Sequence, residues 1–507
     1  MQPPPARRHP IEIVARAARR HAHTALVDGE GEITYGALVV LAERAATHLL
    51  DGRADLAGAR VAFLVPPGRD YVATLWGVWL AGGVAVPLCL THPPAEMVYV
   101  LADADATIVV AHPHFEPVAR DLAASRGARF VTTDAFRTSM PAAAFPDVSP
   151  DRRAMVVYTS GTTGKPKGVV TTHGNIAAQI TSLIEAWEWS SKDRILHVLP
   201  LHHLHGIINV LACALWAGAV CETMPRFDAR AVWQRFGAGG LTLFMAVPVI
   251  YHRLIAVWEE SDPAQRVSMT RAASALRLMV CGSAALPVPV FQRWQVVGGH
   301  TLLERYGMTE IGMALSNPLH CERRPGSVGA PLPGVEIRLV DDNGTVVRAD
   351  DQPGEIQVRG PAVFMEYWRR PLETVAAFQE GWFKTGDIAV RRAGVYAILG
   401  RSSVDIIKTG AYKVSALEVE QELLARPDIE ECAVVGAPDE EWGERVCVAV
   451  KWRSGCGLPL EELRAWCKER LAVYKVPSRL LSVADLPRNA VGKVTKKDVK
   501  ALFATRK

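Results

Sequence analysis

Hydrophobic residues along this chain gather in short runs that alternate with longer stretches of mixed polarity. The runs at residues 60–65, 107–110 and 276–280 have the length of buried β-strands, whereas the stretches between them repeat apolar residues near helical spacing. Strands that alternate with helices indicate parallel sheets covered by helices. The pattern therefore predicts an α/β fold.

The pattern changes towards the C-terminus. From about residue 326 to residue 390, short strands are separated by Gly, Pro and Asp, which predicts a smaller β-rich subdomain. After residue 400 the remaining chain is long enough for a small α+β domain. Its expected elements are helices at 417–425 and 460–471 and strands at 429–436 and 446–452.

Length and composition limit the classes of protein that fit. A chain of 507 residues is too long for one core, so at least two domains are expected. Net charge is only +4 and no long basic tract occurs, which argues against a nucleic-acid partner. The 9 cysteines are scattered singly without a C-x-x-C pair, so they indicate reduced thiols rather than a zinc ribbon or a disulfide framework.

The N-terminal region predicts a cytoplasmic location. Residues 1–10 contain no secretory hydrophobic region. Residues 11–23 are rich in Ala and Arg, as in a transit peptide, but their apolar residues recur near helical spacing and predict the first helix of the fold. The mitochondrial matrix is the alternative for a eukaryotic source.

One uncharged stretch, residues 71–90, is about as long as a membrane span. Gly82 and Gly83 divide it into a helix, a turn and a strand at 84–88, so a buried α/β element is expected and a span is not.

Residues 158–168, Tyr-Thr-Ser-Gly-Thr-Thr-Gly-Lys-Pro-Lys-Gly, concentrate groups that bind phosphate. Glycines let backbone N–H groups approach an anion, hydroxyls add donors and lysines add charge. The apolar residues 154–157 predict a buried strand before the loop. The spacing is not that of a Walker A motif, since Pro166 and Val169, five positions after Gly161 and Gly164, stand where its second Gly would be. A flexible surface turn is the alternative, but two lysines flanking a proline favour a triphosphate-binding loop.

This loop resembles the phosphate-binding signature of the adenylate-forming enzymes, which include the acyl-CoA synthetases. Four further motifs follow in that family's order: residues 304–310 (Glu-Arg-Tyr-Gly-Met-Thr-Glu), 381–387 (Gly-Trp-Phe-Lys-Thr-Gly-Asp), Gly400-Arg401 and 487–493 (Pro-Arg-Asn-Ala-Val-Gly-Lys). The narrower resemblance is to the malonyl-CoA synthetases of mitochondrial type, which also accept methylmalonate; it rests on residues 199–206, 281–286 and 404–418.

The resemblance implies two steps. The substrate carboxylate attacks the α-phosphorus of ATP and pyrophosphate leaves; the thiol of coenzyme A then displaces AMP. Such chemistry depends on positioning and charge neutralisation rather than on a protein nucleophile. It also implies a large N-terminal adenylation domain, residues 1–400, and a small mobile C-terminal domain, residues 401–507. Malonate, ATP and CoA are the partners expected; the oligomeric state stays open.

The same resemblance assigns the ATP site. Tyr306 would stack on adenine, Asp387 would accept hydrogen bonds from the ribose, and Glu310 would bind Mg²⁺ through hard oxygen ligands. The ATP-binding residues it implies are Thr159, Ser160, Gly161, Thr162, Thr163, Gly164, Lys167, Tyr306, Gly307, Thr309, Asp387, Arg401 and Lys493.

Lys493 is implied to bridge the carboxylate and the α-phosphate during adenylation, together with Thr309, Glu310 and His205 as catalytic residues. Rotation of the C-terminal domain would then withdraw Lys493 and present a second segment to CoA. That segment contributes Lys408, Gly410, Tyr412 and Lys413. Many relatives carry the hinge residue two positions after the Arg; here this position is Ser403, and Asp405 follows one residue late, so the pivot is left open.

The acyl pocket is implied to include His205, Ser283 and Met308. Malonate carries a second carboxylate, whose burial requires a cation. Arg253 in the otherwise apolar segment 244–258 is our candidate, and an arginine reaching solvent from an apolar helix is the alternative. The histidines at 202, 203 and 205 lack acidic or Cys neighbours at ligand spacing, so they do not indicate a metal site.

Three other functions remain open from sequence. They are a CoA ligase for another short or medium carboxylic acid, an enzyme that loads a carrier protein, and a catalytically silent nucleotide-binding module. A cation placed for a second carboxylate would distinguish the first of these from a malonate enzyme.

Overall fold

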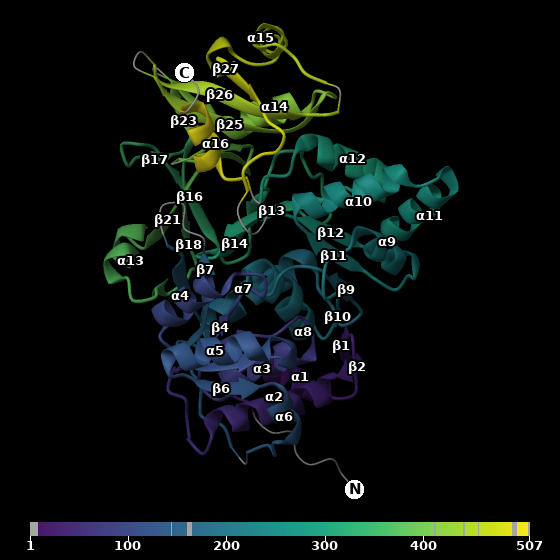
Figure 1. Ribbon diagram of the computed structural model, residues 1–507, viewed down its shortest axis with the longest axis vertical. Helices are drawn as coiled ribbons and strands as arrows, with labels where there is room; N and C mark the ends of the chain where they lie inside the picture. The colour runs from purple at the N-terminus through teal and green to yellow at the C-terminus, as the bar shows by residue number, and fades with distance from the viewer. Residues whose placement is uncertain are drawn as a thin grey trace.

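The computed structural model describes residues 9–142, 144–159, 165–402, 404–409, 412–439, 442–454, 456–488 and 494–504. Four sheets with helices packed against them confirm the α/β fold class (Figure 1). Among the described residues, no helix has both the length and the apolar character needed to cross a membrane.

The first sheet delivers the phosphate loop. Its order is β19-β8-β7-β4-β3-β5-β6, with a parallel centre that ends in the antiparallel pair β7–β8. Apolar residues fill both faces of the central strands, as expected of parallel strands covered on both sides. The strands are β3 (Arg60–Leu64), β4 (Val84–Pro87), β5 (Ala106–Ala111), β6 (Arg129–Thr132), β7 (Arg153–Thr159), β8 (Lys167–Thr172) and β19 (Glu366–Tyr367).

The second sheet carries the 304–310 motif. Its order is β15-β14-β13-β12-β11-β9-β10-β1-β2, and parallel pairing joins β1 to β13 through β10, β9, β11 and β12. The strands are β1 (Thr24–Asp28), β2 (Gly31–Thr34), β9 (Arg194–His197), β10 (Val220–Thr223), β11 (Leu243–Ala246), β12 (Leu278–Cys281), β13 (Leu303–Met308), β14 (Gly312–Ser316) and β15 (Ala330–Pro331).

Helices bury one large core between and around these two sheets. Trp76, Trp79, Trp187 and Trp294 are almost completely buried there. The helices are α1 (Glu12–Arg19), α2 (Tyr35–Leu50), α3 (Arg69–Leu80), α4 (Pro94–Ala104), α5 (Glu116–Arg126), α6 (Asp134–Thr138), α7 (His173–Trp187), the π-helix η2 (His205–Ala212), α8 (Cys213–Ala217), α9 (Ala229–Gly237), α10 (Pro248–Glu260), α11 (Pro263–Ser274) and α12 (Val288–Gly298).

The third sheet confirms the β-rich subdomain. All of its strand pairs are antiparallel, and it extends to residue 401, beyond the expected end at residue 390, because β21 and β22 form one long hairpin. Its elements are β16 (Glu336–Val340), β17 (Val346–Val347), β18 (Gly354–Arg359), α13 (Pro371–Ala377), β20 (Phe378–Gln379), β21 (Trp382–Arg392) and β22 (Val395–Arg401).

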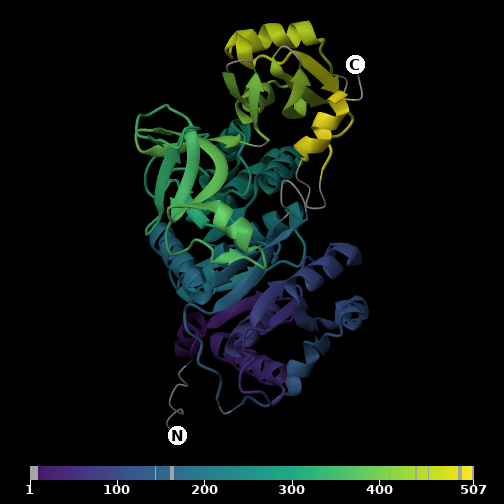
Figure 2. The same ribbon diagram turned by 90° about the vertical axis from the view of Figure 1, so that its left-hand side faces the viewer.

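The fourth sheet belongs to the C-terminal part of the chain, which forms a lobe at one end of the molecule (Figure 2). It has its own apolar core, and two helices and two strands expected there are present. The elements are β23 (Ile406–Thr409), β24 (Tyr412–Ser415), α14 (Ala416–Leu424), β25 (Ile429–Asp439), β26 (Gly443–Trp452), α15 (Leu460–Lys468), β27 (Arg479–Ser482) and α16 (Lys496–Ala504).

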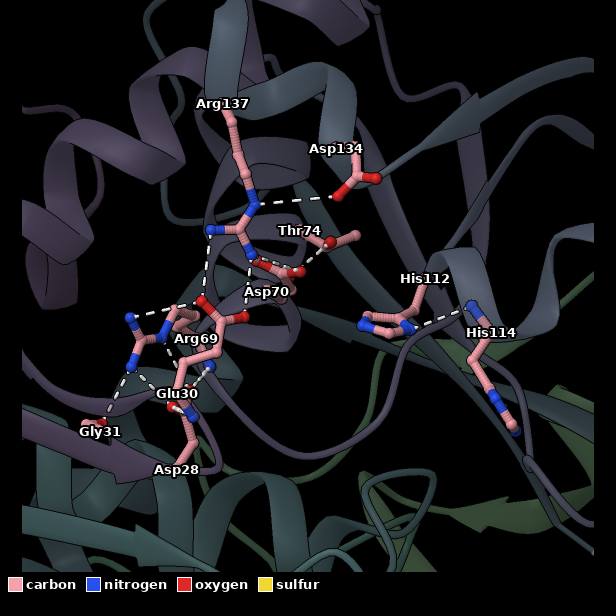
Figure 3. Close-up of polar contacts among 10 residues, drawn as sticks. All are labelled: Asp28, Glu30, Gly31, Arg69, Asp70, Thr74, His112, His114, Asp134 and Arg137. Atoms are coloured by element: carbon pink, nitrogen blue, oxygen red, sulfur yellow. Dashed lines mark hydrogen bonds and ion pairs between the residues drawn. The ribbon is translucent and has the colours of Figure 1, made fainter.

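A group of charges at the other end joins the β1–β2 hairpin to α3 and α6 (Figure 3). Arg69 Nη2 lies 2.6 Å from Asp28 Oδ1, and Arg137 Nη2 lies 2.9 Å from Glu30 Oε1 and 3.5 Å from Asp70 Oδ1. We call these five residues the N-terminal ionic cluster. Each of its charges faces an opposite charge, so the cluster fastens three elements together.

Candidate active site

The two stems of the phosphate loop are held by β7 and β8. Thr159 ends β7 and pairs in register with Lys167, the first residue of β8. Lys167 makes a close ion pair with Glu373 of α13, and its Nζ lies 5.3 Å from the centroid of the Tyr367 ring. The five loop residues assigned to phosphate binding, Ser160, Gly161, Thr162, Thr163 and Gly164, lie outside the described residues.

A hydrogen-bond network on α4 braces both stems. The Tyr158 hydroxyl, before the loop, donates to Asp103 Oδ2 over 2.8 Å, and the Tyr99 hydroxyl donates to the Pro166 carbonyl over 2.8 Å. Arg370 joins the two by donating to Asp103 Oδ1 over 2.7 Å and to the Tyr99 hydroxyl over 3.2 Å. The network fixes where the loop leaves and rejoins the sheet.

Three sheet residues meet where the ribose was expected. The Tyr306 hydroxyl donates to Asp387 Oδ2 over 2.6 Å, and Arg401 Nε donates to Asp387 Oδ1 over 3.2 Å. Burial raises the pKa of Asp387, while Arg401 and Tyr306 act against that rise. Residues from β13, β21 and β22, far apart in sequence, are thus brought together as the motifs predicted.

Glu310 lies in the turn that follows β13, one residue after Thr309, and its side chain is buried. Its Oε1 accepts a hydrogen bond of 3.0 Å from the Tyr367 hydroxyl. Burial raises the pKa of Glu310, and the bond from Tyr367 acts against that rise.

The donor set at Glu310 fits Mg²⁺ and not zinc. Among the described residues, no three His, Cys, Asp or Glu side chains gather as a metal site. Mg²⁺ typically takes one or two carboxylates and completes its shell with phosphate oxygens and water. A single buried carboxylate beside the stem of a phosphate loop meets that requirement.

The acyl side of the site contains His205, Ser283 and Arg305. His205 opens the π-helix η2, a type of helix that often marks functional sites, and its Nδ1 lies 3.1 Å from Ser283 Oγ. Burial lowers the pKa of His205 well below its usual value, so the ring is neutral. Its Nε2 has no hydrogen-bond partner among the described residues. Ser283 adopts a left-handed backbone conformation with φ of 68°, which is uncommon for residues other than glycine.

Arg305 is a residue that the sequence interpretation missed. It is only 3% exposed, and its Nη2 donates to Ser283 Oγ over 3.4 Å. The guanidinium fits against Gly282, where an added Cβ would stand 2.6 Å from Arg305 Nη1. Burial lowers the pKa of Arg305 to about 10, so the side chain is still a cation at pH 7.

No described carboxylate forms an ion pair with Arg305. Glu304 is its neighbour in β13, but successive side chains of a strand point to opposite faces. Glu304 Oε1 accepts a hydrogen bond of 3.1 Å from the Leu286 N–H, and burial raises the pKa of Glu304 to about 8. Arg305 is therefore a buried cation without an ion-pair partner in the described part of the chain, and Glu304 and Cys281 act on it only through longer-range electrostatics.

Arg253, our sequence-based candidate for that cation, lies on an exposed position of α10. An arginine in water contributes little to the burial of a carboxylate. The sequence did contain a signal for Arg305, because Glu304 and Arg305 are two adjacent charged residues that follow the apolar residues 302 and 303.

His202 and His203 pack as aromatic rings. Their ring centroids are 4.1 Å apart, and burial lowers the pKa of His202 to about 3.

The segment assigned to CoA forms the β23–β24 hairpin of the C-terminal lobe, in which Lys408 pairs with Lys413. Tyr412 is 50% exposed and stacks on Tyr474, with ring centroids 4.1 Å apart. Gly410 and the proposed catalytic Lys493 lie outside the described residues. The hairpin belongs to a different sheet from the ATP and acyl residues.

Comparisons with known proteins identify the same family in the N-terminal and the C-terminal parts of the chain. Residues 13–368 match the family model described as AMP-binding enzyme, and residues 418–493 match the AMP-binding enzyme C-terminal domain. Malonate–CoA ligase ACSF3, mitochondrial, of Xenopus laevis is 46% identical, over 98% of this chain and 92% of its own length. Malonate–CoA ligase of Arabidopsis thaliana is 42% identical, over 90% and 79% respectively. The crystal structure of ATP-bound MatB from Rhodopseudomonas palustris superposes with a TM-score of 0.89 at 33% identity, covering 98% of this chain and 99% of that one.

Proposed function

Because this chain belongs to the AMP-binding enzyme family and is an AMP-forming CoA ligase that uses ATP and CoA, we propose that its acid substrate is malonate, with methylmalonate as a second acid. In the first step the acid's carboxylate oxygen attacks the α-phosphorus of ATP and pyrophosphate leaves. In the second step the CoA sulfur attacks the acyl carbon of the adenylate, AMP leaves with the shared oxygen, and malonyl-CoA is formed.

One observation carries the choice of a dicarboxylic acid: Arg305 is a buried cation whose Nε has no hydrogen-bond partner and which forms no ion pair among the described residues. A second carboxylate that enters a partly dry pocket needs such a partner, and the planar guanidinium can bind it through two hydrogen bonds. Ser283 and the neutral ring of His205 add polar contacts beside it. This assignment of Arg305 replaces our earlier choice of Arg253.

A monocarboxylic acid is the rival substrate. An acid such as propionate would leave Arg305 uncompensated in the occupied site, which costs free energy. The pairing of charge therefore favours the dicarboxylate. Met308, which ends the same strand β13, is a further residue that we propose for substrate binding.

For ATP we keep the residues implied by the motifs. Thr159 and Lys167 would meet the phosphates with the loop between them, Gly307 and Thr309 would lie beside the α-phosphate, and the pair Asp387 and Arg401 would bind the ribose. Bound Mg²⁺ would supply positive charge to the phosphate oxygens, and Glu310 is the residue we propose to hold it. Lys493 would act on the carboxylate and α-phosphate in the first step only.

For CoA we propose the β23–β24 hairpin, with its boundary to the adenylation domain at residues 400 and 401. Exposed stacked rings at Tyr474 and at Tyr412 of the hairpin, which also carries the exposed Lys408, suit a partner that has a flat base and phosphates. Rotation about the segment after Arg401 would carry this hairpin to the site and remove Lys493 from it.

We also propose that the enzyme works in a reducing compartment, the cytoplasm or the mitochondrial matrix. All 9 cysteines are free, and the Xenopus laevis relative named above is mitochondrial.

A panel of acids tests the function. Wild-type enzyme would be assayed with malonate, methylmalonate, propionate and acetate, and pyrophosphate release and CoA-thioester formation would both be measured. We expect malonate to give the highest kcat/KM. A preference for propionate or acetate would remove the dicarboxylate proposal and leave a generic acyl-CoA ligase.

A matched pair of arginine variants identifies the cation. Arg305→Met should lower kcat/KM for malonate by about 10²-fold, since loss of one partner of a buried charge pair costs about 2–5 kcal/mol. Its effect on propionate should be much smaller. Arg253→Ala should leave both acids within about threefold, and the opposite result would return the role to Arg253.

A further inference from the structure

Tyr367 lies between two groups that the site uses. Its hydroxyl donates to Glu310 Oε1 over 3.0 Å, and its ring faces Lys167 Nζ at 5.3 Å from the centroid. The carboxylate is our proposed metal ligand and the ammonium belongs to the phosphate loop. Tyr367 comes from neither motif, because it reaches the site from β19.

The backbone and ring of Tyr367 are held firmly. β19 pairs with β8, so that Tyr367 stands opposite Val169, and the Tyr367 N–H donates to Thr374 Oγ1 over 3.0 Å. The Phe364 ring packs against its ring at a centroid distance of 4.8 Å. The Phe364 N–H also donates to the Glu310 carbonyl over 2.7 Å, which ties the turn containing Glu310 to the same segment.

The hydroxyl can act only as a hydrogen-bond donor to Glu310. The phenol O–H carries the proton of this contact and the ionised Glu310 carboxylate can only accept it. A protonated phenol that occupies one oxygen fixes the rotation of the carboxylate and directs its other oxygen.

We propose that Tyr367 is a positioning residue that orients Glu310 towards the metal of the bound nucleotide and offers its ring to Lys167 on the phosphate side. The inference rests on the ATP and Mg²⁺ roles in the proposed function. It adds a second layer to the site, in which one aromatic side chain sets the geometry of both the metal ligand and the phosphate-loop cation.

Two variants separate the contact with Glu310 from the contact with Lys167. Tyr367→Phe removes the hydroxyl but keeps the ring over Lys167, so only the contact to Glu310 is lost. Tyr367→Leu removes both contacts. If Tyr367 served only in core packing, Tyr367→Phe would keep the wild-type ATP affinity, because Phe fills nearly the same volume.

Equilibrium binding of ATP provides the test, measured by calorimetry in excess Mg²⁺ and again in EDTA, with the acid and CoA left out so that no turnover occurs. We expect Tyr367→Phe to weaken binding in Mg²⁺ about tenfold and to leave binding in EDTA unchanged, as for one hydrogen bond to a charged group. Tyr367→Leu should weaken binding in both conditions.

Tyr35→Phe is the matched control. The Tyr35 hydroxyl donates to the Ala219 carbonyl over 2.7 Å in the core of the other sheet, so its loss removes a buried tyrosine hydroxyl away from the site. Its ATP affinity should equal that of wild type in both conditions.

Three results would overturn the role of Tyr367. They are an equal loss in Mg²⁺ and in EDTA for Tyr367→Phe, no loss in Mg²⁺, or a wild type whose ATP affinity is independent of Mg²⁺. Since the acid is absent, this outcome is separate from the identity of the substrate, which the panel of acids decides.

Discussion

The N-terminal ionic cluster and residues Glu304 and Arg305 of β13 both contain buried ionisable groups, but the partners of these groups differ. In the cluster, burial pushes the pKa of Asp28 up, and hydrogen bonds from Arg69 outweigh that effect, so that the pKa lies below its usual value. In β13, burial raises the pKa of Glu304 to about 8 and lowers the pKa of Arg305 to about 10, and the electrostatic interaction between the two residues opposes both changes without reversing them.

Under our proposal, this difference separates charges that hold the fold from a charge that binds the substrate. A buried charge with a complete set of partners contributes to local structure, whereas an uncompensated one is unfavourable until something binds it. The cluster joins the β1–β2 hairpin, α3 and α6 (Figure 3), while Arg305 stands beside the residues of the acyl site. The variants below change charges of each kind.

The largest effect is expected at Lys493, a charge whose proposed partner is the reacting molecule itself. Lys493→Ala should slow adenylate formation by about 10²–10³-fold, since it removes one contact to charge that develops in that step. Transfer of the acyl group from supplied malonyl-AMP to CoA should be largely unchanged. The two half-reactions would be measured separately, and equal damage to both would contradict the role.

Glu310 should give the next effect, because its carboxylate has a hydrogen bond but no described ion pair. In Glu310→Gln the amide keeps the shape and loses the charge that Mg²⁺ requires, so turnover should fall about 10–100-fold at limiting Mg²⁺. A titration of activity against Mg²⁺ would show it, and near wild-type turnover at limiting Mg²⁺ would remove the assignment. Added zinc should not restore activity.

Replacement of Arg69 should lower the stability of the fold, whereas replacement of Arg305 should not. Arg69→Met leaves Asp28 without its partner and should lower the free energy of unfolding by about 1–3 kcal/mol. Arg305→Met replaces an uncompensated buried cation by an apolar side chain and should leave stability unchanged or higher. Denaturant unfolding of both variants would measure this, and a destabilised Arg305→Met would mean that the cation has a structural partner.

Activity should fall more in Arg305→Met than in Arg69→Met, the reverse of the order expected for stability. Arg69→Met should keep kcat/KM for malonate within about threefold of wild type, since the N-terminal ionic cluster lies outside the site. A large loss of activity in a folded Arg69→Met variant would break the distinction between the two regions.

The smallest effect concerns the pH dependence of stability. The folded-state pKa of Glu304 is raised from 4.5 to about 8, so its contribution is fully present below pH 4.5 and is lost as the pH rises towards and through 8. Glu304→Gln should thus match wild type in thermal unfolding near pH 5 and exceed it near pH 8.5. The exposed Glu322→Gln should differ from wild type equally at both pH values, and a constant gain for Glu304→Gln would contradict the raised pKa.

The local pattern of apolar and polar residues predicted most helices and strands, but it did not predict where all of them end. The expected strand 429–436 runs to Asp439, because β25 and β26 pair in register up to Gly443 and extend as one hairpin. The expected helix 460–471 ends at Lys468 instead, and the chain turns there so that Leu471 joins the core. Pairing and packing between elements decided these ends, and neither is visible in a local window.

The sequence by itself determined the fold class and the family, because these depend on periodicity and on motifs that are contiguous in the chain. Only the tertiary structure decided which of the two candidate arginines is buried. Arg253 and Arg305 both stand among apolar residues in the sequence, and their burial depends on which face of each element is covered. It also brought Tyr367 from β19 to Glu310, since strand pairing with β8 joins segments that lie almost two hundred residues apart.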